Sequence, residues 1–577
     1  MISTGRMSGL AGAAVAATVA AVLALSSPTA SAPAKAKVSA PACDTAGLSL
    51  PPGFCATVFA DNLGHVRHMA FGPDGTLFAN TWSGRYFPRS PPPAAPFLIA
   101  LRDTKGAGVA DQTVRFGQGP GDGVGGGNGV AVYKGHVYAD VDDKIVRYPL
   151  GKTGLAENVK AEVVLSGMPL TGDHPMHPFV ISPKGEIFVD MGSATNACDV
   201  NNRKPHTPGH TPCTEKETRA GVWKYDADTL GQVFSAKERY ATGIRNGEGL
   251  SFDRAGRLYD TQHGRDQLPS NWPELYPDLK HATELPAEEL VLIRPGGDYG
   301  WPECYYDGFQ DKLVLAPEYG GDGGKTVGVC AQRIAPVAAF PGHWAPNDLA
   351  IYNAAQFPAP YHGGAFIAFH GSWNRAPEPQ AGFNVVFQPL ADGHAAGRFI
   401  LFADGFTGGV RDRSKAAFRP TGLVVGPDGA LYISDDVKGR IWKVVYRGPP
   451  GAAHLVAATP AKVDETAAAA APAKALPVPP GSTEAEVKAG EALFQSKTCV
   501  GCHGAGARGS AVGPDLTAGT WLWGDGSLAS IRSTIDKGVP APKQYRSPMP
   551  ARGGAALTDA ELQAVSAYVW AVGHQPK

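Results

Sequence analysis

The 577-residue sequence has no excess of charge of either sign and no block of basic residues. Lysine and arginine number 52 and aspartate and glutamate 53, so the formal net charge is −1. Proteins that bind nucleic acid or anionic membrane surfaces carry a basic patch or block. Neither partner is therefore expected, and small molecules and other proteins remain as binding partners.

Long apolar runs are also scarce. The most apolar segment, residues 10–25, is rich in alanine and shorter than the roughly 20 strongly apolar residues that cross a bilayer. Arg6 precedes it, and the small-residue sites Ala30–Ala32 and Ala34–Ala36 follow it. This pattern predicts a cleaved secretory signal peptide over residues 1–36 rather than a membrane anchor, and no transmembrane span in the mature protein.

Of only eight cysteines, two lie in the run Cys499–His503, with the sequence Cys-Val-Gly-Cys-His. Such a run is typical of covalent haem attachment through Cys499 and Cys502. His503 is then the predicted proximal iron ligand, and Met549, 46 residues downstream in a proline-fixed loop, the second axial ligand. A zinc site would require a second Cys/His pair, which this region lacks. A thioredoxin-like redox dithiol would require a βαβ pattern around the two cysteines. Haem c, and with it electron transfer, is therefore favoured.

The other six cysteines fall into the local pairs Cys43/Cys55, Cys198/Cys213 and Cys304/Cys330. No histidines cluster around them at metal-ligand spacing, so three short-range disulfides are favoured over metal binding, although sequence alone does not give the connectivity. Disulfides form in oxidising compartments. Together with export and covalent haem, they predict a location in a bacterial periplasm.

One unit, a short strand, a tight turn and a second strand, recurs six times. The copies lie at residues 69–78, 130–138, 180–189, 250–259, 349–368 and 423–433, with almost no helical periodicity between them. This repetition predicts an all-β six-bladed β-propeller, since a β-sandwich would not repeat one hairpin signature at such spacings. The insertions 195–220 and 265–290 are expected as loops on a face of the propeller, where function tends to concentrate.

The composition changes after Tyr446 to a stretch rich in alanine and proline, and from Ser482 the pattern becomes helical. We therefore expect the propeller over residues 41–447, a linker over 448–481 and a small all-α cytochrome c domain over 482–577. The last helix of this domain is expected to open with a capping box, in which Thr558 and Glu561 satisfy each other's backbone N–H groups.

Four stretches within the expected propeller resemble a known family. They are Gly-Ile-Arg-Asn at 243–246, Gln-His-Gly-Arg-Asp-Gln at 262–267, Gly-Gly-Asp-Tyr-Gly-Trp-Pro at 296–302 and the run 366–375, which ends His-Gly-Ser-Trp-Asn-Arg. They resemble the soluble PQQ-dependent sugar dehydrogenases, especially the sorbosone or pyranose dehydrogenase branch, over most of residues 45–446. The resemblance implies that a sugar, or a related aldehyde or alcohol, is oxidised with hydride passing to PQQ. Electrons would leave through the haem to an external cytochrome or oxidase.

The resemblance implies that His174 is the catalytic base. It stands nine residues before the turn proline Pro183, the spacing of the family's catalytic histidine, whereas His177 does not match. A neutral imidazole suits proton abstraction near neutral pH. The family's glucose enzymes carry an aspartate where this chain has Ser193, so the partner that orients His174 is either Asp173 or Ser193.

PQQ carries three carboxylates, which require cationic partners. The resemblance implies the following contacts with PQQ: Arg245, Asn246, His263, His343, Arg375, Arg419 and Arg67. Thr421 stands where the glucose enzymes have a further arginine, and Arg375 is the expected replacement for their lysine. A Ca²⁺ ion that polarises the quinone carbonyl is implied at the backbone carbonyls of Gly264 and Arg265.

Two other functions fit a propeller joined to a cytochrome. A Ca²⁺-dependent, lactonase-like hydrolase would turn over without PQQ, and its substrate would not reduce the haem. A non-enzymatic module that docks the cytochrome to a partner would take up no PQQ at all. Addition of PQQ, Ca²⁺ and candidate sugars, with the haem spectrum as readout, separates the three.

Overall fold

The computed structural model describes residues 43–81, 96–117, 127–151, 154, 160–376, 378–413, 415–449, 451, 454–463 and 476–575. The last range has gaps at 498, 504–506, 508, 510–512, 546–547 and 556. The predicted signal peptide, residues 1–36, lies outside the described residues.

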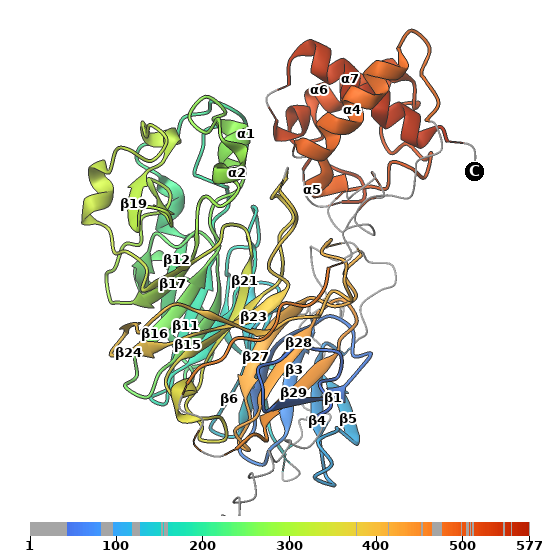
Figure 1. Cartoon of the computed structure of the whole chain (residues 1–577). Coiled ribbons are helices and arrows are strands. Elements are labelled where there is room, and N and C mark those ends of the chain that lie inside the picture. The colour runs from blue at the N-terminus through green and yellow to red at the C-terminus, as the bar shows by residue number, and fades with distance from the viewer. Residues whose placement is uncertain are drawn as a thin grey trace, which may run out of the picture. The chain divides into compact units, whose positions relative to one another are not determined.

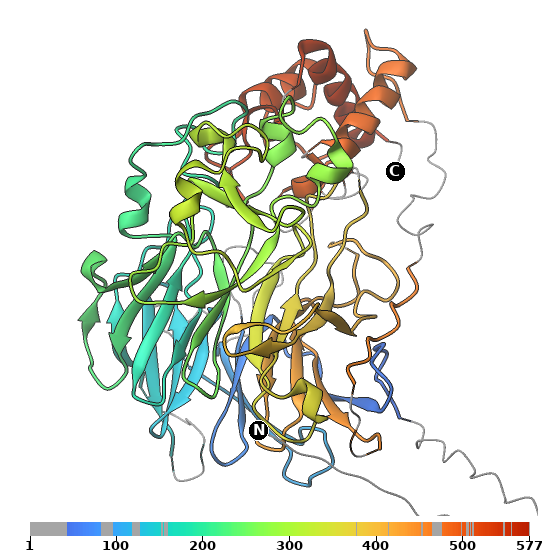
Figure 2. The same cartoon turned by 60° about the vertical axis from the view of Figure 1, so that its left-hand side comes forward.

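Six sheets of four or five strands form the propeller, and each contains one of the predicted hairpins (Figures 1 and 2). We number them as blades along the chain. Blade 1 comprises β2 (Val66–Phe71), β3 (Leu77–Thr81), β4 (Leu98–Arg102) and β5 (Gln112–Phe116), and blade 2 comprises β6 (Val130–Tyr133), β7 (His136–Val141), β8 (Lys144–Pro149), β9 (Glu162–Ser166) and β13 (Gln232–Val233). Blade 3 comprises β10 (Phe179–Ile181), β11 (Glu186–Met191), β12 (Gly221–Asp226) and β14 (Arg239–Thr242).

The remaining three blades follow the same pattern. Blade 4 comprises β15 (Gly247–Phe252), β16 (Leu258–Gln262), β17 (Glu288–Ile293) and β20 (Ala338–Phe340). Blade 5 comprises β21 (Pro346–Ile351), β22 (Ala365–Phe369), β23 (Asn384–Gln388) and β26 (Ile400–Ala403), and blade 6 comprises β27 (Pro420–Val425), β28 (Leu431–Asp435), β29 (Ile441–Tyr446) and β1 (Phe54–Ala60). The six-bladed prediction is confirmed.

The first and last strands of the propeller close the ring in blade 6. Strand β1 pairs antiparallel with β29, with Phe54 opposite Tyr446, and Figure 1 shows the blue strand beside the orange ones. Closure of this kind removes two open strand edges that would otherwise pair with other chains. The sequence pattern identified the β27–β28 hairpin but not the contribution of β1 to it.

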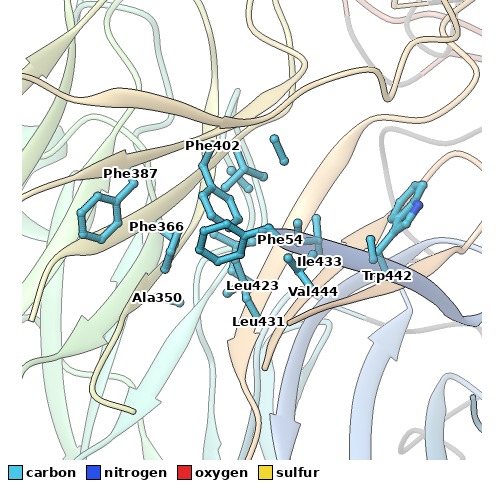
Figure 3. Packing of buried hydrophobic residues seen from close by; sticks show 14 of the residues in the cluster. Phe54, Ala350, Phe366, Phe387, Phe402, Leu423, Leu431, Ile433, Trp442 and Val444 are labelled. Carbon is cyan, nitrogen blue, oxygen red and sulfur yellow. The ribbon is translucent and has the colours of Figure 1, made fainter. Parts of the chain in front are cut away.

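Aromatic rings fill the junction between blades 5 and 6 (Figure 3). The ring of Phe54 lies 5.0 Å from that of Phe402 and 4.8 Å from that of Phe357, both edge to face. Phe366 lies 4.6 Å from Phe402 in the same cluster. Buried aromatic pairs in this geometry stabilise a core beyond the area they bury, so the closing strand is held by packing as well as by hydrogen bonds.

The insertions extend from one end of the sheets, as both views of α1, α2 and β19 show (Figures 1 and 2). Residues 195–220 connect β11 to β12, and the segment between β16 and β17 holds α1 (Leu268–Asn271) and α2 (Leu279–Ala282). A third insertion, between β17 and β20, forms β18 (Cys304–Asp307) and β19 (Lys312–Leu315) and was not predicted. The three predicted disulfides are present: Cys43–Cys55, Cys198–Cys213 and Cys304–Cys330.

Shorter elements complete the chain before the linker. They are the strands β24 (Leu390–Ala391) and β25 (His394–Ala395) and the 3₁₀ turns Thr214–Glu217, Ala236–Glu238, Pro317–Tyr319, Gly328–Gln332 and Ala359–Tyr361. Within the predicted linker, Ala458 N donates to Leu401 O (2.8 Å) and Ala461 N to Asp404 Oδ2 (3.1 Å). This part of the linker therefore runs along the edge of blade 5.

The C-terminal segment is helical, as predicted. It contains α4 (Glu484–Ser496), α5 (Cys499–His503), α6 (Leu528–Lys537), the 3₁₀ turn Ala551–Gly554 and α7 (Asp559–Gly573). Capping boxes open α4 at Thr483 and α7 at Thr558, the second as predicted. Phe494 packs on Tyr568 in a core shared by α4, α6 and α7. Within the described parts of the chain, no helix is long and apolar enough to cross a membrane.

Candidate functional site

One cavity of the propeller gathers most of the predicted site residues. The predicted residues that line it are Arg67, His174, Arg245, Asn246, His263, Gly264, His343 and Arg419. They come from the loops and strand ends of several blades, which explains why they are scattered over more than 350 positions of the sequence. The structure therefore brings together a set that was assembled from sequence resemblance alone.

His174 lies in the segment before β10 rather than on a strand, because Pro175 and Pro178, which follow it, cannot donate to a strand ladder. Its Nδ1 lies 3.0 Å from the carbonyl oxygen of Ser193 and 2.9 Å from the Ser193 hydroxyl. A carbonyl oxygen only accepts, so Nδ1 carries the proton and Nε2 keeps its lone pair. The Ser193 hydroxyl in turn donates to Thr195 O (2.6 Å).

Burial and the nearby Arg245 guanidinium lower the pKa of His174 well below its usual range. Arg203 acts in the same direction, whereas Asp173 and Asp266 oppose it. The imidazole is therefore neutral over a wide pH range, and a neutral imidazole with a free lone pair on Nε2 is what a general base requires. Gly192 leaves room for this ring, since a Cβ there would lie 2.5 Å from the Cβ of His174.

His177 has a different environment. Its Nε2 bonds to Pro169 O (2.9 Å), the residue is 1% exposed, and burial lowers its pKa to about 4. It is not among the residues that line the cavity. These observations favour a structural role for His177, whose sequence spacing also failed to match.

Asp266 joins two arginines beside His174. Its Oδ2 accepts from Arg245 Nη2 (2.9 Å) and Arg203 Nη2 (3.0 Å), and its Oδ1 accepts from Asn374 Nδ2 (2.6 Å). Although burial opposes the charged form, Arg245 and Arg203 hold the pKa of Asp266 below its usual range. Asp173 is bonded to Arg203 as well (2.8 Å), so it does not orient His174; Ser193 does.

The loop after β16 is fixed by Glu288. Glu288 accepts from Gly264 N (2.8 Å) and Ala345 N (3.0 Å), and burial raises its pKa to about 8. The Gly264 carbonyl, one of the two predicted Ca²⁺ ligands, accepts from Arg245 Nη1 (3.0 Å). Among the described residues no three His, Cys, Asp or Glu side chains gather to hold a metal ion. Ca²⁺ at Gly264 and Arg265 stays a prediction.

Arg67 lies at the centre of the polar network inside the blades. Its Nε donates to Asn128 Oδ1 (2.6 Å) and its Nη1 to Asp436 Oδ2 (2.7 Å), while Nη2 lies 3.6 Å from Glu248 Oε2. These groups belong to different blades, so the guanidinium ties the blades together where their inner strands meet. The side-chain oxygens of Asn128, Asp436 and Glu248 could otherwise bind a metal ion beside Arg67, but they already face its guanidinium group.

Arg419 is oriented by backbone carbonyls. Its Nε donates to His370 O and its Nη2 to Gly371 O, both at 2.9 Å. Burial and the proximity of Arg413 and Arg67, only partly offset by Asp436, lower the pKa of Arg419 to about 10. Guanidinium groups crowded in this way favour a bound anion.

The other predicted contacts differ in their exposure to the cavity. His263 and His343 line it, with their Nε2 atoms bonded to Pro346 O (3.0 Å) and Leu285 O (3.2 Å). Arg375 is bonded to Glu284 and to Gly342 O (2.7 Å) and is not among the lining residues. Asn374, its neighbour, does line the cavity. A role of Arg375 in cofactor binding stays a prediction.

The helical domain has a second, mainly apolar cavity. Cys499, Cys502, His503 and Met549 line it together with Phe494, Trp521, Ile531, Ile535, Tyr545, Val565 and Val569. His503 Nδ1 lies 3.1 Å from Pro514 O, which leaves Nε2 for a metal, and Met549 is positioned by its backbone pairing with Val539 (2.7 and 3.0 Å). Neither cysteine is in a disulfide. These residues fit a covalently bound haem.

Burial raises the pKa of the Cys499 thiol to about 12. A redox dithiol of the thioredoxin kind works through a lowered thiol pKa. The environment of Cys499 therefore argues against that alternative.

Comparison with protein-family models classifies both parts of the chain. The model described as TrAA12-like matches residues 126–447, more than half of the sequence. The chain belongs to the TrAA12-like family. The Cytochrome c family model matches residues 487–573, so this TrAA12-like protein carries a C-terminal cytochrome c domain.

Curated relatives match the two parts of the TrAA12-like chain separately. A pyrroloquinoline quinone-dependent pyranose dehydrogenase of Coprinopsis cinerea is 28% identical over 257 residues, which span 39% of this chain and 34% of the relative. The cbb3-type cytochrome c oxidase subunit FixP of Rhizobium etli is 35% identical over 91 residues, 15% of this chain and 31% of the relative. The matches span about a third of these relatives.

A solved structure of a Trichoderma reesei carbohydrate-active enzyme of family AA12 resembles the TrAA12-like chain with a TM-score of 0.55 at 18% identity, covering 70% of this chain and 99% of that one. The PQQ domain of the Coprinopsis cinerea pyranose dehydrogenase gives 0.52 at 20% identity, covering 69% and 97%. At these identities the likeness establishes the fold.

Several residues of the site were not predicted. Asp266 and Arg203 organise the surroundings of His174, and Trp373, Lys204 and Arg413 also line the cavity. Asp266 lies within the motif 262–267, and Arg203 and Lys204 lie in the insertion 195–220, so both sequence features indicated the region without indicating the side chains. Their roles depend on contacts between blades, which a single sequence does not show.

Proposed function

We propose that this TrAA12-like protein is a dehydrogenase that oxidises a sugar, or a related alcohol or aldehyde, with PQQ in the propeller and haem c in the C-terminal domain. His174 is the base, and electrons pass through the haem to an external cytochrome or oxidase. The relationship to a PQQ-dependent pyranose dehydrogenase and to a cytochrome c oxidase subunit supports both halves of this proposal. An exported, periplasmic protein suits its disulfides and covalent haem.

The observation that carries the proposal is the fixed tautomer of His174. Because Nδ1 donates to Ser193, the lone pair of Nε2 is available to a substrate hydroxyl in the cavity. The hydroxyl donates its hydrogen bond to Nε2, and the proton moves there as the C–H bond breaks. Asp266 and Asp173 favour the imidazolium that forms, since both carboxylates raise the proton affinity of His174.

The charges of the cavity fit a multiply anionic cofactor. PQQ, when bound, supplies an acceptor of hydride and bears three carboxylates. Arg419, with its lowered pKa, would hold a carboxylate. Arg245 and Arg67 would contribute charge, because the N–H groups of Arg245 already bond to Asn196, Gly264 and Asp266 and those of Arg67 to Asn128 and Asp436. Asn246 would add a neutral contact.

The network around Arg67 weighs against the hydrolase alternative. A Ca²⁺-dependent hydrolase needs oxygen ligands that are open to a metal and to the substrate. Asn128 and Asp436 are instead bonded to Arg67, and the buried carboxylates of Asp190 and Asp260 are not among the residues that line the cavity, so they are not open to a substrate.

A spectroscopic titration separates the candidate functions. Purified, PQQ-free protein is given PQQ and Ca²⁺, then a panel of aldoses, uronic acids, alcohols and aldehydes under anaerobic conditions, with the reduced haem bands recorded. We expect haem reduction by at least one class of sugar and none without PQQ. Product formation without PQQ would support the hydrolase, and no PQQ uptake would support the docking module. Haem that stays oxidised with every substrate would contradict the proposal.

A further inference from the structure

Two buried carboxylates in neighbouring blades lack the partners that buried charges need. Asp190 on β11 and Asp260 on β16 are both fully buried. Asp190 Oδ1 accepts from Gly247 N (3.2 Å), but among the described residues Asp190 Oδ2 and both oxygens of Asp260 accept no hydrogen bond of good geometry, although the Thr261 N–H lies close enough to Asp260 to oppose the rise of its pKa. A buried ionised carboxylate without compensation is strongly destabilising, so the pair must either keep its protons or be neutralised by a bound cation.

The unpartnered oxygens converge at Gly247, the first residue of β15. A Cβ at this glycine would lie 2.5 Å from Asp260 Oδ2 and 2.6 Å from Asp190 Oδ2, so the two oxygens lie within about 5 Å of each other. Strand β15 pairs with β16 and contacts β11, which explains how two blades meet at this point (Figure 1). An ion whose bonds to oxygen are 2.3–2.6 Å long can bridge oxygens at such a separation.

The surroundings are acidic. Burial, the repulsion between the two aspartates and the nearby Glu248 raise the pKa of Asp190 well above its usual range, and burial and Glu248 do the same for Asp260. Asp140, on the neighbouring blade 2, is also buried, and its pKa is raised to about 8. The cation of this region, Arg67, bonds to Asn128 and Asp436. Without a bound cation the two aspartates therefore keep their protons to a higher pH than usual, and a cation that binds between them displaces those protons.

We propose that Asp190 and Asp260 together bind a hard divalent cation, with Ca²⁺ as its natural occupant, and that this ion joins blades 3 and 4. The donors are carboxylate oxygens alone, the type that Ca²⁺ prefers, and its tolerance of irregular geometry suits a site with two side-chain ligands. Water and backbone carbonyls would complete its coordination. The site involves neither Gly264 nor Arg265 and does not depend on PQQ.

The test counts metal in the PQQ-free full-length protein. Wild type, the double variant Asp190→Asn/Asp260→Asn and a matched control, Asp140→Asn, are equilibrated with Ca²⁺, freed of excess ion and analysed for calcium per chain. Asp140 is equally buried, but its Oδ1 already accepts from Gly129 N (2.5 Å) and Asn80 Nδ2 (3.2 Å). We expect the wild type and the control to hold one more Ca²⁺ per chain than the double variant.

Equal calcium content in the wild type and a folded double variant would overturn the proposal and show that protons or water satisfy the pair. Should the double variant fail to fold, thermal unfolding of wild type decides. An ion that binds only the folded state raises its melting temperature. Identical melting curves with Ca²⁺ and with a chelator would overturn the proposal, and a higher melting temperature with Ca²⁺ in wild type and in Asp140→Asn, but not in Asp260→Asn, would support it.

Discussion

His174 is oriented by a hydroxyl and a backbone carbonyl, where the resemblance had indicated an aspartate in related glucose enzymes. The structure decides between the two partners that the sequence left open, because Asp173 is bonded to Arg203 and Asn202 and Ser193 to His174. A neutral partner fixes the tautomer without raising the proton affinity as a carboxylate would. The proposed base therefore stays neutral to a lower pH than it would with an aspartate partner.

Replacement of His174 by alanine removes the proposed proton acceptor. We expect turnover of the PQQ-loaded protein to fall by about 10²- to 10⁴-fold, the usual contribution of a general base. The measurement is the rate with an artificial electron acceptor, together with PQQ binding followed by fluorescence quenching. PQQ should bind nearly as tightly as to wild type. Turnover within twofold of wild type would show that another group is the base.

A Ser193→Asp variant tests the tautomer through pH. In wild type, burial and Arg245 lower the pKa of His174, so the base stays neutral and kcat/KM should be flat from pH 8 to below pH 6. A carboxylate at position 193 raises this pKa, and the variant should lose activity at a higher pH than wild type because its base becomes protonated sooner. Ser193→Ala, which leaves the backbone carbonyl, is the control. Superimposable pH profiles would contradict the assignment.

At the scale of elements, the six hairpins were predictable because each has an apolar strand, a Gly turn and a second apolar strand in one short segment. Strand β1 was not, since its partner β29 lies almost 400 residues away and only the closed ring joins them. The insertion with β18 and β19 was missed for a similar reason: its core forms around the Cys304–Cys330 disulfide rather than a long periodic pattern.

Phe54 holds the closing strand. Its 3% exposed side chain packs against Phe402 and Phe357, so Phe54→Ala should lower the free energy of unfolding by about 3–5 kcal/mol. Val58, on the same strand and only half-buried, provides a control: Val58→Ala should cost less than half as much. Equilibrium unfolding in urea measures both changes. Equal effects would indicate that pairing rather than packing closes the ring.

For the whole molecule, the proposed function takes electrons out of the protein through the haem domain, one at a time. The sequence predicted its ligands from the Cys499–His503 run and the Met549 loop, and the structure places all four residues around one cavity. The sequence could not show which protein groups orient these ligands. His503, for example, is held by Pro514 O, which lies in a loop without a recognisable sequence pattern.

Replacement of Met549 by alanine should change the haem and spare the propeller. A methionine ligand raises the haem potential. We therefore expect a lower reduction potential and an altered visible spectrum, with unchanged turnover when an artificial acceptor takes electrons directly from the propeller. Redox titration and the acceptor assay measure the two quantities. An unaltered spectrum would place the axial ligand elsewhere.

Substrate-driven haem reduction in the full chain tests the central claim most directly. The PQQ-loaded protein is mixed anaerobically with a sugar identified from the panel, and the reduced haem band is followed over time in wild type, His174→Ala and His177→Ala. The account predicts reduction in wild type and in His177→Ala, and loss of it in His174→Ala and in wild type without PQQ. Haem reduction that persists without PQQ, or that survives in His174→Ala, would contradict it.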